Sequence, residues 1–109
     1  MIRVGVFGAA GRMGATVCRA VIDAPGIELV AAVDPQHAGI DLSQLGVQGT
    51  NVQVAPKATA MRDADAQVAV DFTVLDAARG NLAWCADNGV HAVVGPHDES
   101  EFAAYASEV

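Results

Sequence analysis

The chain has 109 residues with six basic and thirteen acidic side chains, which give a formal charge of -7. This length leaves room for one compact domain, and a hydrophobic fraction of 52% is typical of a chain that folds around a core. The acidic balance excludes a basic stripe for nucleic-acid binding, and no run of about 18 apolar residues predicts a membrane span. No charged leader followed by an apolar segment marks the N-terminus for export, so we expect a cytoplasmic domain over residues 1–109.

The first half of the chain predicts a strand, a helix and a second strand. Ile2–Phe7 and Ile27–Val33 are apolar, β-branched runs of the kind found in buried parallel strands. Between them, and up to the stop signal Pro25-Gly26, apolar side chains recur at helical spacing: Met13, Val17, Val21 and Ala24. Residues 35–51 show little periodicity and are expected to be mostly loop.

The second half continues this alternation. We expect a strand over 52–54, a helix over 58–63, a strand over 67–72, a helix over 75–87, a strand over 91–94 and a helix that opens at Asp98. One side of the helix over 75–87 is expected to carry Leu75, Ala78, Leu82 and Cys85. Five strands that alternate with helices predict an α/β fold with a doubly wound parallel sheet of the Rossmann type.

The two cysteines are expected to stay reduced and apart. Cys18 and Cys85 lie on the helices that follow the first and fourth strands, and these helices cover opposite faces of a doubly wound sheet. We therefore expect both thiols to serve as small core side chains rather than as a disulfide.

A glycine-rich segment stands where the first strand meets the first helix. Residues 8–14 read GAAGRMG, a G-x-x-G-x-x-G variant of the dinucleotide fingerprint. One glycine permits the tight turn, one lets the backbone approach a pyrophosphate and one lets the helix pack close to the strand, while the helix N-terminus offers N–H groups to phosphates. Tight packing of helix on strand is the alternative explanation, and Arg12 suits either the phosphates and adenine or an exposed helix start. The expected cofactor residues here are Gly8, Ala10, Gly11, Arg12, Met13 and Gly14.

Two further strand ends carry polar residues that belong at the same edge of such a sheet. Asp34 lies twenty residues after Gly14 and ends the second strand, where a carboxylate accepts hydrogen bonds from ribose hydroxyls, although an aspartate before proline is also an ordinary turn residue. Asp71-Phe72-Thr73 ends the fourth strand, and we expect the backbone at Phe72 and Thr73 to line the nicotinamide. The alternative is that Asp71 or Thr73 caps the next helix.

Several short motifs combine in register along the chain: VFGAAGRMG at 6–14, AAVD at 31–34, VDFT at 70–73, GNL at 80–82 and NGVHAVVG at 88–95. Together they resemble the N-terminal cofactor domain of the dihydrodipicolinate reductase family of lysine and diaminopimelate biosynthesis. The resemblance implies reduction of 4-hydroxy-tetrahydrodipicolinate to tetrahydrodipicolinate by NADH or NADPH, in a cytoplasmic homotetramer. It also assigns Gly95 to the cofactor site.

The resemblance also shows what these residues lack. The family's paired histidines, catalytic lysine and G-T motif lie in a second domain, so we expect a fragment or truncated product that binds the cofactor without catalysis. His37, His91 and His97 do not replace them, and we assign no catalytic residue and no metal ligand. Leu75 stands where the family usually has proline. The alternatives are a stand-alone nucleotide-binding or redox-sensing module and another Rossmann dehydrogenase such as homoserine dehydrogenase.

Two details bear on how the cofactor is held. Asp34 suits ribose hydroxyls and repels a 2′-phosphate, with no following arginine to offset it, so NADH is expected to be preferred and NADPH remains possible. The family's G-T-T-G loop is replaced by Gly95-Pro96-His97-Asp98, which has no threonine hydroxyls. We therefore expect the adenosine half of the cofactor to be held more firmly than the nicotinamide half.

Overall fold

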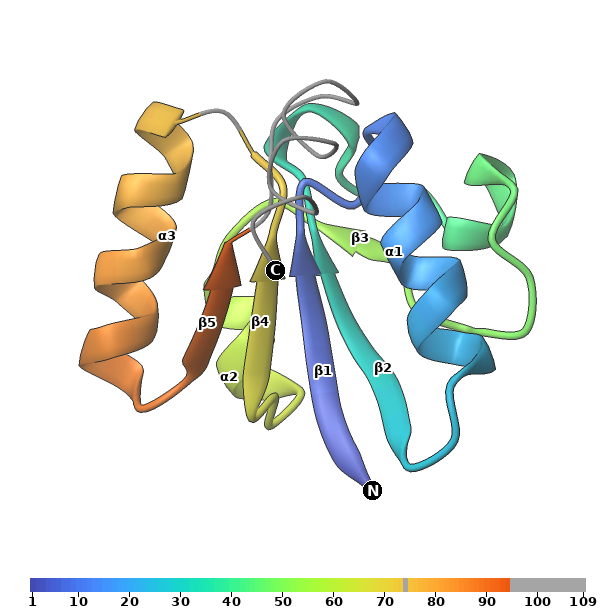
Figure 1. Ribbon diagram of the computed structural model, residues 1–109. Coiled ribbons are helices and arrows are strands. Elements are labelled where there is room, and N and C mark those ends of the chain that lie inside the picture. The colour runs from blue at the N-terminus through green and yellow to red at the C-terminus, as the bar shows by residue number, and fades with distance from the viewer. Residues whose placement is uncertain (74, 95–109) are drawn as a thin grey trace, which may run out of the picture.

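A computed structural model describes residues 1–73 and 75–94 and places five parallel strands in one sheet, in the order β3-β2-β1-β4-β5 (Figure 1). The elements are β1 (Ile2–Phe7), α1 (Arg12–Asp23), β2 (Ile27–Val33), the 3₁₀ turns η1 (Pro35–His37) and η2 (Leu42–Leu45), β3 (Val54–Ala55), α2 (Thr59–Asp63), β4 (Val68–Asp71), α3 (Leu75–Asn88) and β5 (His91–Val94). The doubly wound α/β fold is confirmed. Within the described ranges, none of the helices is long and apolar enough to cross a bilayer.

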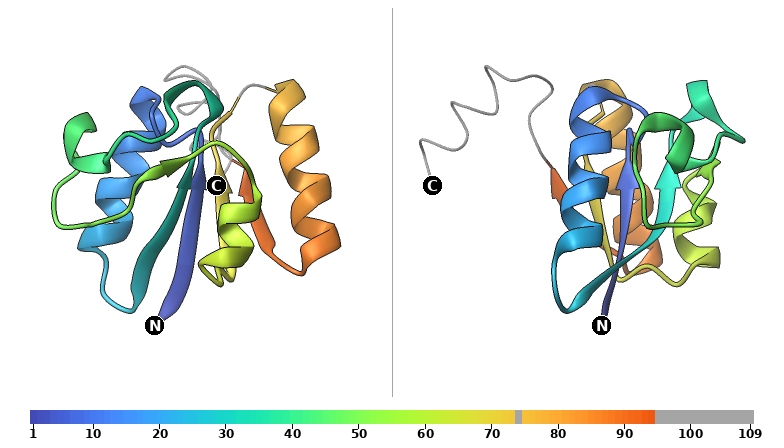
Figure 2. Two further views of the ribbon diagram at one scale, coloured as in Figure 1. Left: turned by 180° about the vertical axis from the view of Figure 1, so that it is seen from behind. Right: turned by 90° about the vertical axis from the view of Figure 1, so that its right-hand side faces the viewer.

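Helices cover both faces of the sheet. The right-hand view of Figure 2 shows α1 on one side and α2 on the other. The core is correspondingly divided into two clusters, one that includes Cys18 of α1 and one that includes Met61 of α2 and Cys85 of α3. The placement expected for the two cysteines is confirmed, because both are buried and they belong to the clusters on opposite faces of the sheet. Burial raises the pKa of the Cys18 thiol to about 11, so the thiol stays protonated at neutral pH.

The strand boundaries agree with the sequence for β1 and β2 and differ for β3. The predicted strand over 52–54 is displaced to Val54–Ala55, where it pairs with Ala32 and Val33 of β2. The preceding residues are engaged elsewhere, since the carbonyl of Val52 accepts from the N–H of Leu42 at 3.2 Å. Residues 52 and 53 therefore contact the segment around Leu42 instead of extending β3.

The segment 35–51 is more ordered than its composition predicts. Asp41 caps η2 by accepting the N–H of Ser43 at 3.0 Å, and its own N–H donates to the Gln44 side chain at 2.9 Å. The hydrogen bonds from Ser43 hold the pKa of the Asp41 carboxyl below its usual range. Leu42 and Val47 are completely buried in the α1-side core. Turns of three or four residues lack the periodicity by which helices are found in a sequence.

The buried side of α3 differs from the prediction at one position. Ala78 and Cys85 are buried as expected, whereas Leu82 is 38% exposed. The half-buried Asn81 instead donates a hydrogen bond to Asp71 of β4. The sequence predicted a shared side of the helix for these residues, and the structure leaves the Leu82 side chain exposed while the neighbouring Asn81 contacts the sheet. The Leu75 side chain and the helix expected from Asp98 lie outside the described residues.

A glycine in the middle of β1 makes room for Met61, the buried side chain of α2. A Cβ atom on Gly5 would overlap Met61 Sδ and lie 2.8 Å from Met61 Cε. Met61 is completely buried against this strand. The absence of a side chain at Gly5 thus allows α2 to pack on the sheet.

We expect Gly5→Ala to lower the free energy of unfolding by about 2 kcal/mol, because overpacking a tight core forces side chains out of their preferred rotamers. Urea denaturation followed by the fluorescence of Trp84 measures this change. In a Met61→Ala background, Gly5→Ala should lower the free energy of unfolding by a much smaller amount. Equal costs in both backgrounds would contradict the contact as the cause.

Candidate functional site

The carboxyl ends of three neighbouring strands lie level with one another. Phe7, the last residue of β1, pairs with Val33 of β2 on one side and with Asp71 of β4 on the other. The strand order reverses at β1, since β2 follows it on one side and β4 lies on the other. Ligands of open α/β sheets bind in the crevice at such a switch point. The loops that follow these three strands therefore border one candidate site.

The glycine loop joins β1 to α1 in a tight turn. Gly8 has a φ of 76°, a conformation that favours glycine, and its carbonyl accepts the N–H of Gly11 at 3.2 Å. Gly11 is the N-cap of α1 and, as a glycine, has no side chain of its own to cap the helix. A twelve-residue helix with such an N-terminus presents N–H donors and the positive end of its dipole to the crevice.

The three glycines of the loop have different surroundings. Gly14 lies so close to β1 that a Cβ atom would overlap the Gly8 carbonyl oxygen and lie 2.9 Å from Ala9 Cα. At Gly11 the nearest described atom to such a Cβ is Gly8 O at 3.5 Å, an ordinary contact, and φ is -72°. The fold therefore requires Gly8 and Gly14, whereas the surroundings of Gly11 have room for a side chain. A pyrophosphate that approaches the backbone would account for glycine at that position.

Asp34 connects the second strand to this loop. Its Oδ2 accepts the N–H of Ala10 at 3.3 Å, and its Oδ1 accepts the N–H of Gln36 at 3.2 Å. The side chain is 14% exposed, and His37 Nδ1 lies 3.7 Å from Oδ1. Both readings of Asp34 from the sequence thus have support, since the carboxylate caps η1 and also faces the glycine loop.

The remaining predicted residues of the loop lie at the start of α1. Arg12 is its first residue and is exposed, and Met13 is half-buried in the first turn. Gly95 and the Pro96-His97-Asp98 sequence after it lie outside the described residues. Of the histidines, His37 lies beside Asp34 and His91 begins β5.

The turn after β4 is organised by the carboxylate of Asp71, which is 2% exposed. Asp71 Oδ1 accepts the backbone N–H of Thr73 at 2.8 Å and its hydroxyl at 2.5 Å, and Oδ2 accepts from Asn81 Nδ2 at 3.0 Å. Burial and, to a lesser extent, the nearby Asp71 charge raise the pKa of Cys85. Sequence analysis did not identify Asn81, although it noted the GNL motif at 80–82.

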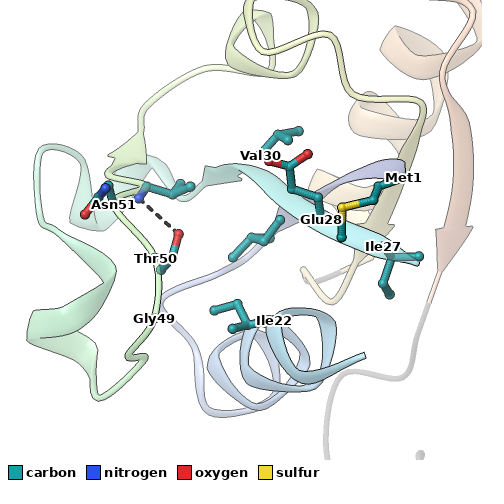
Figure 3. A pocket seen from close by; sticks show the side chains of 10 residues that line it. Met1, Ile22, Ile27, Glu28, Val30, Gly49, Thr50 and Asn51 are labelled. Atoms are coloured by element: carbon teal, nitrogen blue, oxygen red, sulfur yellow. Dashed lines mark hydrogen bonds between the residues drawn. The ribbon is translucent and has the colours of Figure 1, made fainter. Parts of the chain in front are cut away.

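A separate groove lies at the other end of the sheet and does not contribute to this site. It has a volume of about 640 Å³ and includes Ile22, Ile27, Glu28 and Asn51 (Figure 3). Ile27 begins β2, so the groove lies along the lower part of that strand, away from the glycine loop. The Glu28 carboxylate at its wall would repel a pyrophosphate. Groove size alone therefore does not locate the cofactor site.

Comparison with known proteins gives a consistent result. The family model described as "Dihydrodipicolinate reductase, N-terminus" matches residues 2–100. The 4-hydroxy-tetrahydrodipicolinate reductase of Beutenbergia cavernae is 46% identical over 94 residues, which are 86% of this chain and 30% of that protein. The enzyme of the same name from Anaeromyxobacter sp. is 39% identical over 117 residues, which cover 100% of this chain and 43% of that protein. The chain thus spans less than half the length of these relatives.

Two solved structures share the fold. Dipicolinate-bound dihydrodipicolinate reductase from Paenisporosarcina sp. TG-14 superposes with a TM-score of 0.70 and 26% identity, over 96% of this chain and 41% of that chain. Aspartate semialdehyde dehydrogenase with NADP from Candida albicans also gives a TM-score of 0.70, at 16% identity over 88% of this chain and 30% of that chain. The second likeness extends to the fold alone.

We expect Gly14→Ala to lower the free energy of unfolding by about 3 kcal/mol, because backbone atoms must move to admit the methyl group. Gly11→Ala should change it by less than about 0.5 kcal/mol, since the weaker N-cap and the lower entropy of the unfolded chain oppose each other. Urea denaturation of both variants measures the contrast. Equal losses would show that the fold itself needs glycine at position 11.

Proposed function

The chain belongs to the dihydrodipicolinate reductase family as its N-terminal domain, and we propose that it binds NADH or NADPH at the carboxyl ends of β1, β2 and β4. The observation that carries the proposal is Gly11, a glycine that neither backbone conformation nor packing requires. Its position at the N-terminus of α1 matches the demand of a pyrophosphate group for nearby backbone N–H donors.

Each strand end has a separate task in this proposal. The N–H groups at the start of α1 hold the pyrophosphate between Gly8, Gly11 and Gly14, with Arg12 and Met13 beside it. Asp34 accepts hydrogen bonds from the adenosine ribose, and Ala10 keeps its carboxylate beside the loop. The cofactor then extends across β1 toward β4.

The nicotinamide half follows the remaining residues of the rim. Phe72 and Thr73 follow β4 and are proposed to line the nicotinamide. Gly95, the next residue in the sequence after β5, is a further proposed cofactor residue. A bound NADH or NADPH supplies a hydride from its nicotinamide ring. The residues of this chain bind and orient the donor, and none of those assigned here holds or protonates an acceptor.

For the longer protein we propose the reduction of 4-hydroxy-tetrahydrodipicolinate in the cytoplasm, with a homotetramer as the assembly. Both relatives named above carry the name of that activity. The 109-residue chain alone is proposed to bind the cofactor without turnover, because hydride transfer also needs an acceptor held against the nicotinamide.

The binding proposal is tested by titrating the 109-residue chain with NADH in a calorimeter. Gly11→Ala should weaken binding by about tenfold, because a methyl group there displaces the pyrophosphate from the N–H groups, while the fold remains intact. Gly26→Ala, at the opposite end of β2, is the control: its φ of 83° makes it the more strained substitution of the two, yet it should leave the dissociation constant unchanged. Absence of NADH and NADPH binding by the parent chain would overturn the proposed function.

We further propose a preference for NADH, because the Asp34 carboxylate repels the 2′-phosphate of NADPH. Asp34→Asn keeps the shape and one acceptor oxygen and removes the charge, so the ratio of the two dissociation constants should move toward NADPH by about tenfold. Titration of parent and variant with both cofactors measures this ratio. Tighter binding of NADPH than NADH by the parent chain would contradict the preference.

A further inference from the structure

A buried carboxylate at the end of β4 has no task in the binding proposal above. Asp71 is 2% exposed and lies on the face of β4 that also buries Ala69. A buried carboxylate costs free energy unless hydrogen-bond donors compensate for the lost water. An apolar side chain at this position would simply continue the core between Ala69 and Cys85, so packing alone does not explain the aspartate.

The donors that satisfy this carboxylate come from two different elements. Thr73 contributes its backbone N–H and its hydroxyl to Oδ1, and Asn81 contributes its side-chain amide to Oδ2. Among residues 1–73 and 75–94, no cation forms an ion pair with Asp71. Asp71 therefore links the turn after β4, through the two Thr73 donors, to the second turn of α3, through the single Asn81 donor.

The same turn rests against the glycine loop. The N–H of Phe72 donates to the carbonyl of Phe7 at 3.3 Å. A Cβ atom placed on Gly8 would lie 3.1 Å from Thr73 Cγ2 and 3.4 Å from the carbonyl carbon of Phe72. The turn is thus held between α3 on one side and the start of the glycine loop on the other.

We infer that Asp71 and Asn81 are positioning residues. They hold the backbone of Phe72 and Thr73 in the position in which it contacts the nicotinamide half of the cofactor. This inference rests on the proposed function. It concerns only the β4 side of the crevice, because the adenosine half contacts the ends of β1 and β2. Loss of the Asp71–Asn81 contact should therefore weaken the binding of NADH. The binding of ADP-ribose, which lacks the nicotinamide, should be nearly unaffected.

Charge exchange between the two positions tests the contact directly. Asn81→Asp places two carboxylates side by side. The dissociation constant of NADH should rise by about tenfold and that of ADP-ribose by less than about twofold. The double variant Asp71→Asn with Asn81→Asp restores one amide and one carboxylate, and NADH affinity should return to within about threefold of the parent. Calorimetric titration of the 109-residue chain with both ligands measures these ratios.

Asn88→Ala is the matched control, because Asn88 is also a half-buried asparagine of α3 whose side-chain amide donates a hydrogen bond, to the carbonyl of Trp84 at 2.8 Å. Its side-chain oxygen also accepts a long hydrogen bond from Arg62 at 3.5 Å. It should lower the melting temperature without changing the ratio of NADH to ADP-ribose affinity. If Asn81→Asp does not fold, Asn81→Ala is used and the same selective loss of NADH affinity is expected.

The outcomes separate this inference from the proposal on which it rests. Three outcomes would overturn the positioning role and leave cofactor binding intact. They are an equal loss of affinity for both ligands in Asn81→Asp, no recovery of NADH affinity in the double variant, and equal affinity of the parent chain for NADH and ADP-ribose. If the parent chain binds neither ligand and does not bind NADPH, the proposed function itself is overturned.

Discussion

The approach of α1 to the end of β1 is the constraint on which the site depends. Gly14 lies against the Gly8 carbonyl with no room for a Cβ atom, so the helix starts directly above the strand. This contact places the N-terminus of α1 beside the crevice where the strand order reverses. A larger residue at position 14 would move the helix away and with it the donors that a pyrophosphate needs.

The loop combines requirements of the fold with a requirement that the fold does not explain. Gly8 needs its positive φ and Gly14 needs the close approach, whereas Gly11 has an ordinary conformation and space around it. A pattern of glycines alone does not separate these cases. The distances from a Cβ atom placed on each glycine separate them, and they show that the backbone at Gly11 has space beside it for a ligand.

Two carboxylates flank β1 at neighbouring strand ends, and their burial gives them different tasks. Asp34 is 14% exposed and faces the glycine loop, where it is available to ribose hydroxyls. Asp71 is 2% exposed and its oxygens accept from Thr73 and Asn81. In the functions proposed above, the first carboxylate contacts the ligand and the second supports the backbone that lines the nicotinamide.

The sequence by itself determined β1, β2, the glycine loop and the position of Asp34, because long apolar runs and glycine spacing are local signals. Its prediction of the fold class is confirmed, since alternating strands and helices favour one sheet topology. Only the tertiary structure decided the bounds of β3, the exposure of Leu82 and the pairing of Asp71 with Asn81. These features depend on contacts between segments that are separated in the sequence. Such contacts produce no periodic pattern of apolar residues, so the sequence does not predict them.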